Sequence, residues 1–294
     1  MSSIFLLPLV DVNWLVYAPF DPARDFRVDP PTVDQSIGET RRLQALMREH
    51  TGGKYILTPH SGTYCRTGYY EGEMLEVYRE AAAEGAELCV HLHEEIKGAG
   101  TRYADRAHVT AMFRDCLQRL QSAGIQPVAY RGGHYAYSTF MSELLEEHGI
   151  FIDCSCCPDL SQPAREAIWT GAEYSGFYLP EDSRRSAAGQ RRTRVFEIPI
   201  GSDGAGTAYR NLLHVEQSEL ENLLRVWAAI LERGRRQSRP QIVHVLFHTG
   251  SMGRPEWVDR FRRFLDFIPE NGGTFVTALE AKSAADRLNC QEAV

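Results

Sequence analysis

The stretch AAEGAELCVHLHEEI, residues 82–96, contains the pattern that decides the fold. A helix-like run stops at Gly85, the apolar run AELCVHL (86–92) follows, and polar residues come directly after it. A glycine that ends a helix just before a short apolar strand is typical of one α/β unit. If this unit recurs along the chain, the sequence predicts parallel strands with helices outside them.

The unit does recur. Further apolar runs with the length of buried strands lie at 4–10, 54–58, 127–130, 150–153, 195–200, 241–247 and 273–277. Helical patterns lie between them at 33–49, 72–84, 106–122, 139–148, 216–233, 256–268 and 278–287. Seven or eight such units in 294 residues predict an α/β fold, a distorted (β/α) barrel of about seven to eight parallel strands. A doubly wound open sheet is the alternative. We expect a single domain over residues 1–294, with an excursion at 158–194 near the site.

Composition excludes several classes of partner. The net charge of −7 argues against general binding to nucleic acid or an anionic membrane surface. No apolar run approaches the roughly 20 residues of a membrane span. The start, IFLLPLV, has no basic leader, so we expect a buried strand rather than a signal peptide, and a cytoplasmic protein. The seven cysteines are then expected to be reduced thiols. CSCC at 154–157 has no second pair for a zinc site, which favours buried thiols.

Polar residues gather where the predicted strands end. They are Asp11 and Asn13, His60, His91 and His93, Arg131 and His134, Asp153, and His248. In parallel α/β folds the carboxyl ends of the strands form the active site. We therefore expect these side chains to meet at one rim of the barrel.

The spacing of these residues suggests a metal site. Asp11 and Asn13 stand two residues apart and face one side of an extended chain, as do His91 and His93. If the chain turns instead, His91 and Glu95 converge. Either pair suits a divalent metal: Zn²⁺, with Co²⁺, Ni²⁺ or Fe²⁺ as alternatives.

Each residue also has a structural interpretation. Asp11 and Asn13 could cap a turn, and Arg131 could hold a structural carboxylate such as Asp153. The glycines of RGGHY (131–135) could serve only a tight turn. His248 alone, like His60 and His244, could be a core histidine. The common position after successive strands is what favours a functional site.

In their order along nearly the whole chain, the segments resemble the NodB-homology polysaccharide deacetylases, carbohydrate esterase family 4. VDVN resembles a DxD form of the first motif, EGAELCVHLHEEI the second, YRGGHYAYS the third and VLFHTG the last. GIFIDCS, FEIPI and the ending FLDFIPENGGTFVTALEA also resemble that family. The resemblance implies a distorted barrel that holds a divalent metal. It also implies an enzyme that removes N-acetyl groups from amino sugars.

The resemblance also implies roles for the residues. The implied catalytic residues are Asp11 as base, Arg131 holding Asp11, and His248 as acid; the implied metal ligands are Asn13, His91, and either Glu95 or His93. The chain departs from the family where Asn13 replaces a metal-binding aspartate and Glu95 a histidine. Four more residues are predicted to line the substrate site: His60, His134, Tyr135 and Asp153.

Three classes of function remain open. The first is a metal-dependent hydrolase removing an acetyl group from an amino sugar that is small or carried by a precursor. The second is another C–N hydrolase on this scaffold, such as a deformylase or a ureide or imide hydrolase. The third is a non-catalytic sugar-binding relative. Tyr135 and Tyr137 could stack on a sugar or pack in the core, and the arginines of 184–194 could hold phosphate or form a solvated surface.

Overall fold

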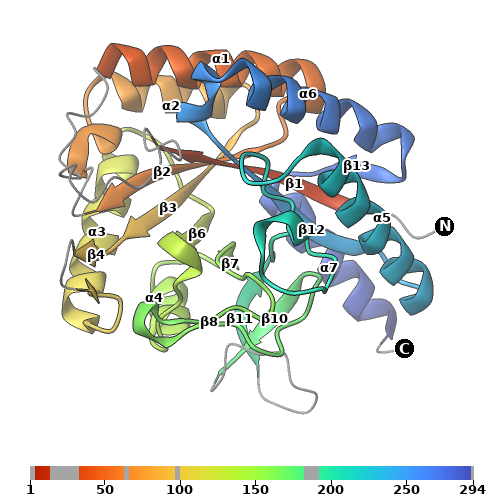
Figure 1. Cartoon of the computed structure of the whole chain (residues 1–294). Helices are drawn as coiled ribbons and strands as arrows, with labels where there is room; N and C mark the ends of the chain where they lie inside the picture. Colours follow the sequence, from red (N-terminus) through yellow and green to blue (C-terminus); the bar gives the residue numbers. More distant parts are fainter. Residues whose placement is uncertain (1–3, 14–32, 63–65, 97–99, 182–191, 293–294) are drawn as a thin grey trace.

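A curled, mostly parallel sheet forms the centre of the protein, with helices outside it (Figure 1). The computed structural model describes residues 4–13, 33–62, 66–96, 100–181 and 192–292. The strand order is β10–β11–β7–β6–β3–β2–β1–β12, with β13 also beside β1. The strands are β1 (Ile4–Val12), β2 (Ile56–Gly62), β3 (Glu87–His93), β6 (Ala129–Gly132), β7 (Ile152–Asp153), β10 (Phe177–Pro180), β11 (Arg192–Glu197), β12 (Gln241–His248) and β13 (Gly273–Phe275).

The sheet curls until its two sides meet. β10 pairs antiparallel with β11, and the other strand pairs of this sheet are parallel. Single parallel bridges then join β12 to the chain beyond β11, Ile200 to His244 and His214 to Leu246. Closure by isolated bridges rather than by a full ladder makes the barrel a distorted one. The predicted α/β barrel is thus confirmed.

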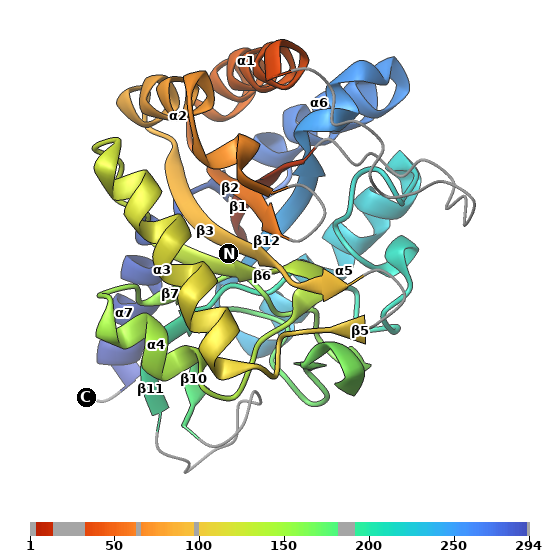
Figure 2. The same ribbon diagram turned by 90° about the vertical axis from the view of Figure 1, so that its left-hand side faces the viewer.

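Helices cover the outer face of this sheet, and Figure 2 shows them around the strands from the side. They are α1 (Val33–Thr51), α2 (Glu73–Ala83), α3 (Arg106–Ser122), α4 (Met141–Glu147), α5 (Leu220–Gln237), α6 (Pro255–Glu270) and α7 (Ala278–Glu292). Helix α3 shows why they form there: its apolar residues recur every three or four positions and are buried. Among the described residues, no helix has the length and apolar character needed to cross a lipid bilayer.

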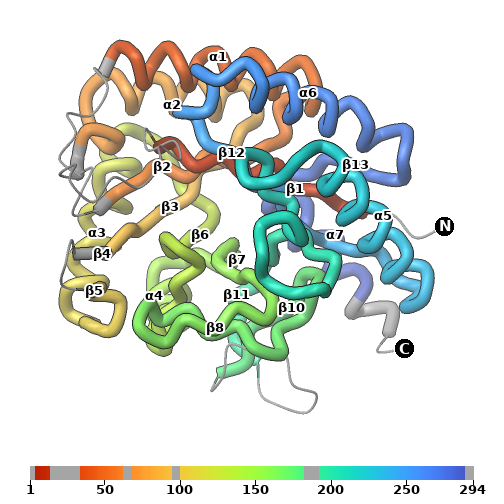
Figure 3. Tube along the Cα trace, viewed as in Figure 1, coloured from red at the N-terminus to blue at the C-terminus, as the bar shows by residue number. Residues whose placement is uncertain are grey.

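The eight predicted strand segments all overlap strands of the sheet, but several strands run further than expected. β1 continues to Val12, β2 to Gly62 and β3 to His93, because the ladder between neighbours persists to the rim. Asp11, His60 and His93, which follow the predicted strands, therefore lie inside the observed ones. Figure 3 follows the chain through these strands from red to blue.

The predicted excursion at 158–194 contains regular structure that the sequence pattern did not reveal. A small hairpin pairs β8 (Ser161–Gln162) with β9 (Ala167–Ile168), and β10 and the start of β11 also fall there. A second hairpin, β4 (Glu95–Ile96) with β5 (Gly100–Thr101), follows β3. Short 3-10 helices, η1 (Arg66–Tyr70), η2 (Gly133–Tyr135), η3 (Pro163–Arg165), η4 (Tyr209–Asn211) and η5 (Thr249–Gly253), lie in the connections.

Candidate active site

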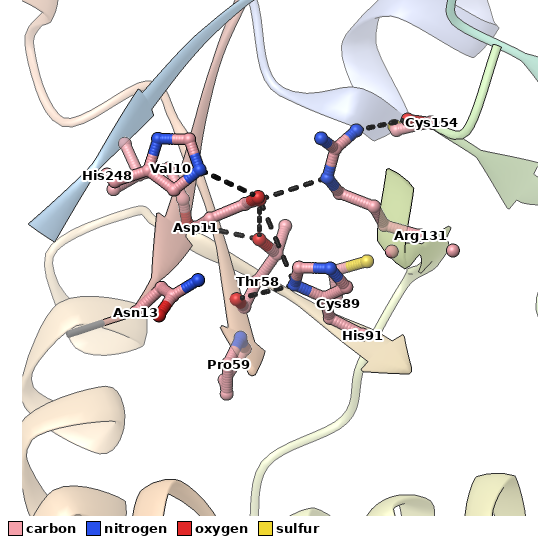
Figure 4. Close-up of polar contacts among 12 residues, drawn as sticks. Val10, Asp11, Asn13, Thr58, Pro59, Cys89, His91, Arg131, Cys154 and His248 are labelled. Atoms are coloured by element: carbon pink, nitrogen blue, oxygen red, sulfur yellow. Dashed lines mark hydrogen bonds and ion pairs between the residues drawn. The ribbon is translucent and has the colours of Figure 1, made fainter. Parts of the chain in front are cut away.

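Asp11, at the carboxyl end of β1, is the centre of the site (Figure 4). Thr58 on β2 and His248 on β12 stand directly beside it in the register of the sheet. The Thr58 hydroxyl donates to Asp11 Oδ1 over 2.5 Å, and His248 Nε2 lies 3.4 Å from Asp11 Oδ2. Residues from both ends of the sequence therefore meet around one carboxylate, which is only 3% exposed.

Arg131 on β6 completes this arrangement from the other side. Its Nε lies 3.0 Å from Asp11 Oδ1, and its Nη1 donates to the Cys154 carbonyl over 2.8 Å. Burial alone would raise the pKa of Asp11, but Arg131, His91 and His248 outweigh it and hold that pKa well below its usual value. Asp11 is therefore a carboxylate at neutral pH, a form in which it can accept a proton.

His248 lies between two carboxylates. Its Nδ1 is 3.1 Å from Glu216 Oε1, and the same oxygen accepts the His248 backbone N–H over 2.7 Å. Burial would lower the pKa of His248, yet Glu216 and Asp11 raise it to about 9. Burial would raise the pKa of Glu216, yet His248 and His214 lower it to about 2. At neutral pH, His248 is thus an imidazolium that can donate a proton.

Glu216 and its second partner, His214, are not predicted by the sequence pattern. The pattern predicts a helix from residue 216, whereas α5 begins at Leu220 and the segment before it runs beside β12. His214 Nδ1 lies 3.4 Å from Glu216 Oε2. The available signal was the spacing of two residues between His214 and Glu216, which puts both on one side of an extended segment.

Replacing Glu216 with Gln should lower the pKa of His248, because the imidazolium loses one of its two carboxylates. We expect the alkaline limb of the kcat/KM profile to move down by about one pH unit or more. An NMR titration of the His248 ring would detect the same shift without relying on activity. Glu219→Gln is the matched control, since Glu219 pairs with Arg260 at an exposed position. An alkaline limb that stays in place would show that Glu216 does not tune His248.

The same pKa shifts predict how stability depends on pH. The raised pKa of His248 stabilises the fold fully below its ordinary value of 6.5, and this contribution is lost as pH rises through about 9. The lowered pKa of Glu216 stabilises the fold above its ordinary value of 4.5, and this is lost as pH falls through about 2. His248 and Glu216 together therefore contribute most to the stability of the fold between pH 4.5 and 6.5.

Four histidines lie beside Asp11 toward the rim. His60 on β2 and His91 on β3 are neighbours in the sheet, and the His60 ring stacks on His93 with 4.1 Å between centroids. The His93 ring is also 4.7 Å from that of His91 and 5.2 Å from that of His134. The structure thus brings the predicted residues His60, His91, His93 and His134 into one cluster.

His91 has the protonation state of a metal ligand. Its Nδ1 donates to the Thr58 carbonyl over 3.2 Å, which leaves Nε2 with a free lone pair. Burial is the main cause that lowers the pKa of His91 to about 3, so the ring stays neutral. Among the described residues, the buried Nε2 has no hydrogen-bond partner.

The turn after β6 explains why the sequence has two glycines before His134. A side chain on Gly133 would place a Cβ 2.5 Å from the His93 ring, and one on Gly132 would meet the Ala136 carbonyl. The glycines therefore allow close packing as well as a turn. His134 and Tyr135 both adopt positive φ, 49° and 64°, which is uncommon for residues with side chains and is often found at functional sites.

Not every predicted metal ligand can be placed with the histidines. Asn13 lies two residues beyond Asp11, and its backbone N–H donates to the Thr249 hydroxyl over 3.1 Å. The side chain of Glu95 lies outside the described part of the structure. Its neighbour Glu94 is buried and pairs with His108 of α3. Within the described residues, no three His, Cys, Asp or Glu side chains already stand in the arrangement of a metal site.

Asp153 has a different environment from the one predicted. It is fully buried on β7, accepts a hydrogen bond from the Ser155 hydroxyl over 2.6 Å, and stands opposite Glu197 of β11. Burial raises the pKa of Asp153 to about 6 and that of Glu197 well above its usual value, so the two carboxyl groups share a proton. Asp153 therefore has Glu197 as a buried partner, and Arg131 contacts Asp11 instead of Asp153. The role of Asp153 in binding substrate stays a prediction.

Tyr137, His244 and the cysteines of the CSCC segment belong to the core. Tyr137 is buried and its hydroxyl bonds to Ser142, so it packs against its neighbours instead of facing a sugar. His244 is buried with its Nδ1 donating to the Ile198 carbonyl. The thiols of the CSCC segment are buried, as expected. Most of the arginine-rich stretch 184–194 lies outside the described residues.

No protein-family model matches the chain, and no curated protein matches it. Solved structures do share its fold. One, described as a polysaccharide deacetylase from Mycobacterium smegmatis, has a TM-score of 0.61 and 17% identity and covers 99% of this chain and 92% of that one. Another, described as a polysaccharide deacetylase from Pseudomonas aeruginosa PAO1, has a TM-score of 0.61 and 16% identity, with 95% and 89% covered.

A Puue allantoinase has a TM-score of 0.59 and 14% identity, with 95% of this chain and 88% of that one covered. At such identities the likeness shows the fold alone. The expected NodB-like architecture is therefore confirmed, and the reaction has to be argued from the site.

Proposed function

We propose that this protein hydrolyses the N-acyl bond of an amino sugar, with acetyl as the preferred acyl group. The observation that carries the proposal is the contact between Asp11 and His248 at the barrel rim. An ionised carboxylate and a protonated imidazole stand 3.4 Å apart, and Arg131 holds the carboxylate from the other side. Amide hydrolysis needs this pairing, since one group must take a proton from water and another must give one to the leaving nitrogen.

In the proposed reaction, Asp11 takes a proton from a water molecule while the oxygen of that water forms a bond to the acyl carbon. His248 then donates its proton to the amide nitrogen as the C–N bond breaks, which releases a carboxylic acid and the free amine. Arg131 keeps Asp11 ionised and oriented, and Glu216 keeps His248 protonated. The fold relationship to two structures described as deacetylases supports acyl hydrolysis.

We also propose that the site holds a divalent metal, with Zn²⁺ as the first candidate and Co²⁺, Ni²⁺ or Fe²⁺ as alternatives. The buried Nε2 of His91 has no hydrogen-bond partner among the described residues and fits such an ion, and neutral imidazoles are ligands that these metals prefer. His93 and Asn13 would complete the set, with Glu95 as the alternative to His93. When bound, the metal would polarise the acyl carbonyl and activate water.

Metal binding is directly testable. His91→Ala should weaken Zn²⁺ binding by at least about 100-fold, because it removes the proposed ligand whose buried Nε2 has no hydrogen-bond partner among the described residues. Metal content after dialysis against a chelator series would measure this. His50→Ala is the control, since His50 pairs with Asp266 on the helical surface. Equal zinc retention by both variants would show that His91 is no ligand.

A second candidate is hydrolysis of another C–N bond, as in a ureide or imide. The Puue allantoinase structure has the same fold with nearly the same TM-score. A deformylase is a further form of this candidate. A non-catalytic sugar-binding protein would not need an ionised Asp11 next to a protonated His248.

Product analysis separates these candidates. Purified protein, with and without added Zn²⁺ or Co²⁺, is incubated with N-acetyl and N-formyl amino sugars and with allantoin. The proposal expects release of acetate and free amine. Formate alone or ring opening of allantoin would favour the second candidate. Sugar binding without any turnover under all metal conditions would overturn hydrolysis.

A further inference from the structure

Arg131 depends on a backbone carbonyl for the direction in which it points. Its Nη1 donates to the Cys154 carbonyl over 2.8 Å, and Figure 4 shows this contact on the side of the guanidinium away from Asp11. The Cys154 N–H in turn donates to the carbonyl of Tyr130, the residue before Arg131, over 2.9 Å. A carbonyl can orient a guanidinium only if its own backbone is fixed, so the groups that fix residues 153–156 also affect how Arg131 meets Asp11.

Ser155 fixes this backbone from the next position. Its hydroxyl accepts the N–H of Gly132, which follows Arg131, over 2.8 Å. The same hydroxyl donates to Asp153 Oδ1 over 2.6 Å. Ser155 is fully buried, where a hydrogen bond is stronger than in water. The segment after β7 therefore holds the backbone on both sides of Arg131, through the Cys154 N–H on one side and the Ser155 hydroxyl on the other.

Two buried carboxyl groups support Ser155. Asp153 and Glu197 are neighbours in the sheet, both are fully buried, and Glu197 Oε1 accepts the Cys156 N–H over 2.9 Å. Among the described residues, no other donor reaches Asp153 Oδ2 or Glu197 Oε2, and one proton shared by the two groups satisfies both oxygens. A chain of hydrogen bonds therefore joins β11, through Glu197, Asp153 and Ser155, to the backbone of β6.

We propose that Ser155 is a positioning residue for Arg131 and that the Asp153–Glu197 pair supports it. In this role the three residues act on the reaction only through Arg131, by fixing the direction in which its Nε meets Asp11. The inference rests on the proposed function, in which Arg131 orients the base. Small misplacements of a catalytic group lower the rate of a reaction by up to about 100-fold, so loss of this support should be visible in turnover.

Ser155→Ala should lower kcat for acetate release from an N-acetyl amino sugar by about tenfold and leave KM nearly unchanged, because Arg131 acts on the base and not on substrate binding. Ser175→Ala is the matched control and should turn over near the wild-type rate. Ser175 is also buried, and its hydroxyl accepts the Ile242 N–H over 2.9 Å at the amino end of β12. If Ser155→Ala does not fold, Ser155→Cys takes its place, since a thiol keeps nearly the same shape and is a weak hydrogen-bonding group.

Two variants of Glu197 separate hydrogen bonding from side-chain volume. Glu197→Met keeps the length of the side chain but makes neither bond, so kcat should fall as it does in Ser155→Ala. Glu197→Gln should restore most of kcat, because its amide oxygen accepts the Cys156 N–H and its amide nitrogen donates to Asp153 in place of the shared proton. Equal kcat values for the two Glu197 variants would overturn the support by the carboxyl pair.

A measurement without turnover separates this positioning role from the function on which it rests. In protein labelled with ¹⁵N-arginine, the Nε–H signal of Arg131 is the one that Arg131→Lys lacks. Ser155→Ala should speed the exchange of this hydrogen with solvent at least about tenfold relative to Ser175→Ala, since Arg131 is held less firmly.

The outcomes differ for the two proposals. In an active wild type, an unaltered kcat or an unaltered exchange rate in Ser155→Ala would overturn the positioning role and leave hydrolysis standing. If the wild type releases no acetate, the proposed function fails and exchange alone decides. Faster exchange in Ser155→Ala than in Ser175→Ala then supports the positioning of Arg131, and equal exchange overturns it.

Discussion

Asp11→Asn is expected to lower kcat by about 10²–10⁴-fold, the usual contribution of a general base. Asparagine keeps the shape of the side chain and can still accept from the Thr58 hydroxyl, but it cannot take a proton from water. The loss should appear in kcat rather than in KM, because the proton transfer takes place in the transition state. Acetate release from an N-acetyl amino sugar, measured over a range of substrate concentrations, would give both constants.

A matched control separates chemistry from folding. Asp259→Asn changes an exposed aspartate of α6 that pairs with Arg262, so it should leave turnover near that of the wild type. Circular dichroism of both variants would show whether the barrel is intact. An intact Asp11→Asn variant that turns over at the wild-type rate would exclude Asp11 as the base and, with it, the proposed division of roles.

Arg131→Ala is expected to destabilise the fold by about 3–5 kcal/mol, since it removes the buried cation that contacts the Asp11 carboxylate opposite His248. Arg131 has two partners in different directions, Asp11 through Nε and the Cys154 carbonyl through Nη1. A lysine has a single ammonium group and cannot reproduce both contacts, so Arg131→Lys should recover only part of the loss. Urea denaturation followed by tryptophan fluorescence would measure the free energy of unfolding.

The same substitution should also change the pH dependence of activity. Arg131 is the strongest influence that lowers the pKa of Asp11 against the effect of burial. Without it, Asp11 would be protonated at higher pH, and the acid limb of kcat/KM would move upward. Arg106→Ala is the control, because its pair with Glu143 is exposed and such pairs contribute about 0–1 kcal/mol. Equal stability losses for the two arginines would show that Arg131 is not an essential partner of Asp11.

Much of the site could be predicted because it follows a local rule. A polar residue at the end of a parallel strand lies at the rim, so the strand pattern alone placed Asp11, His91, Arg131 and His248 in one neighbourhood. The rule gave no information on which side chains pair. Asp153 also ends a strand, yet its neighbour in the sheet is Glu197, because strands β7 and β11 bring these two carboxyl groups together.

The groups around His248 show what the sequence pattern could not provide. Glu216 and His214 lie in a segment without strand or helix periodicity, and their position beside β12 comes from the closure of the barrel. Ser155 likewise resembles any loop serine until the sheet places the Gly132 N–H beside its hydroxyl. Hydrophobic periodicity within a single element cannot predict these contacts, because each contact joins two segments that are distant in the chain.

The sequence by itself predicted the α/β barrel, the described α-helices, every described strand of its main sheet except β10, and the polar residues at its rim. These follow from hydrophobic periodicity and glycine stops, which act over a few residues. Only the tertiary structure decided which carboxylate meets which cation, which ring nitrogen of His91 pairs with the Thr58 carbonyl, and which serine bonds to the backbone beside Arg131. Those outcomes depend on strand register and barrel closure, and both are set by packing between distant segments rather than by local propensity.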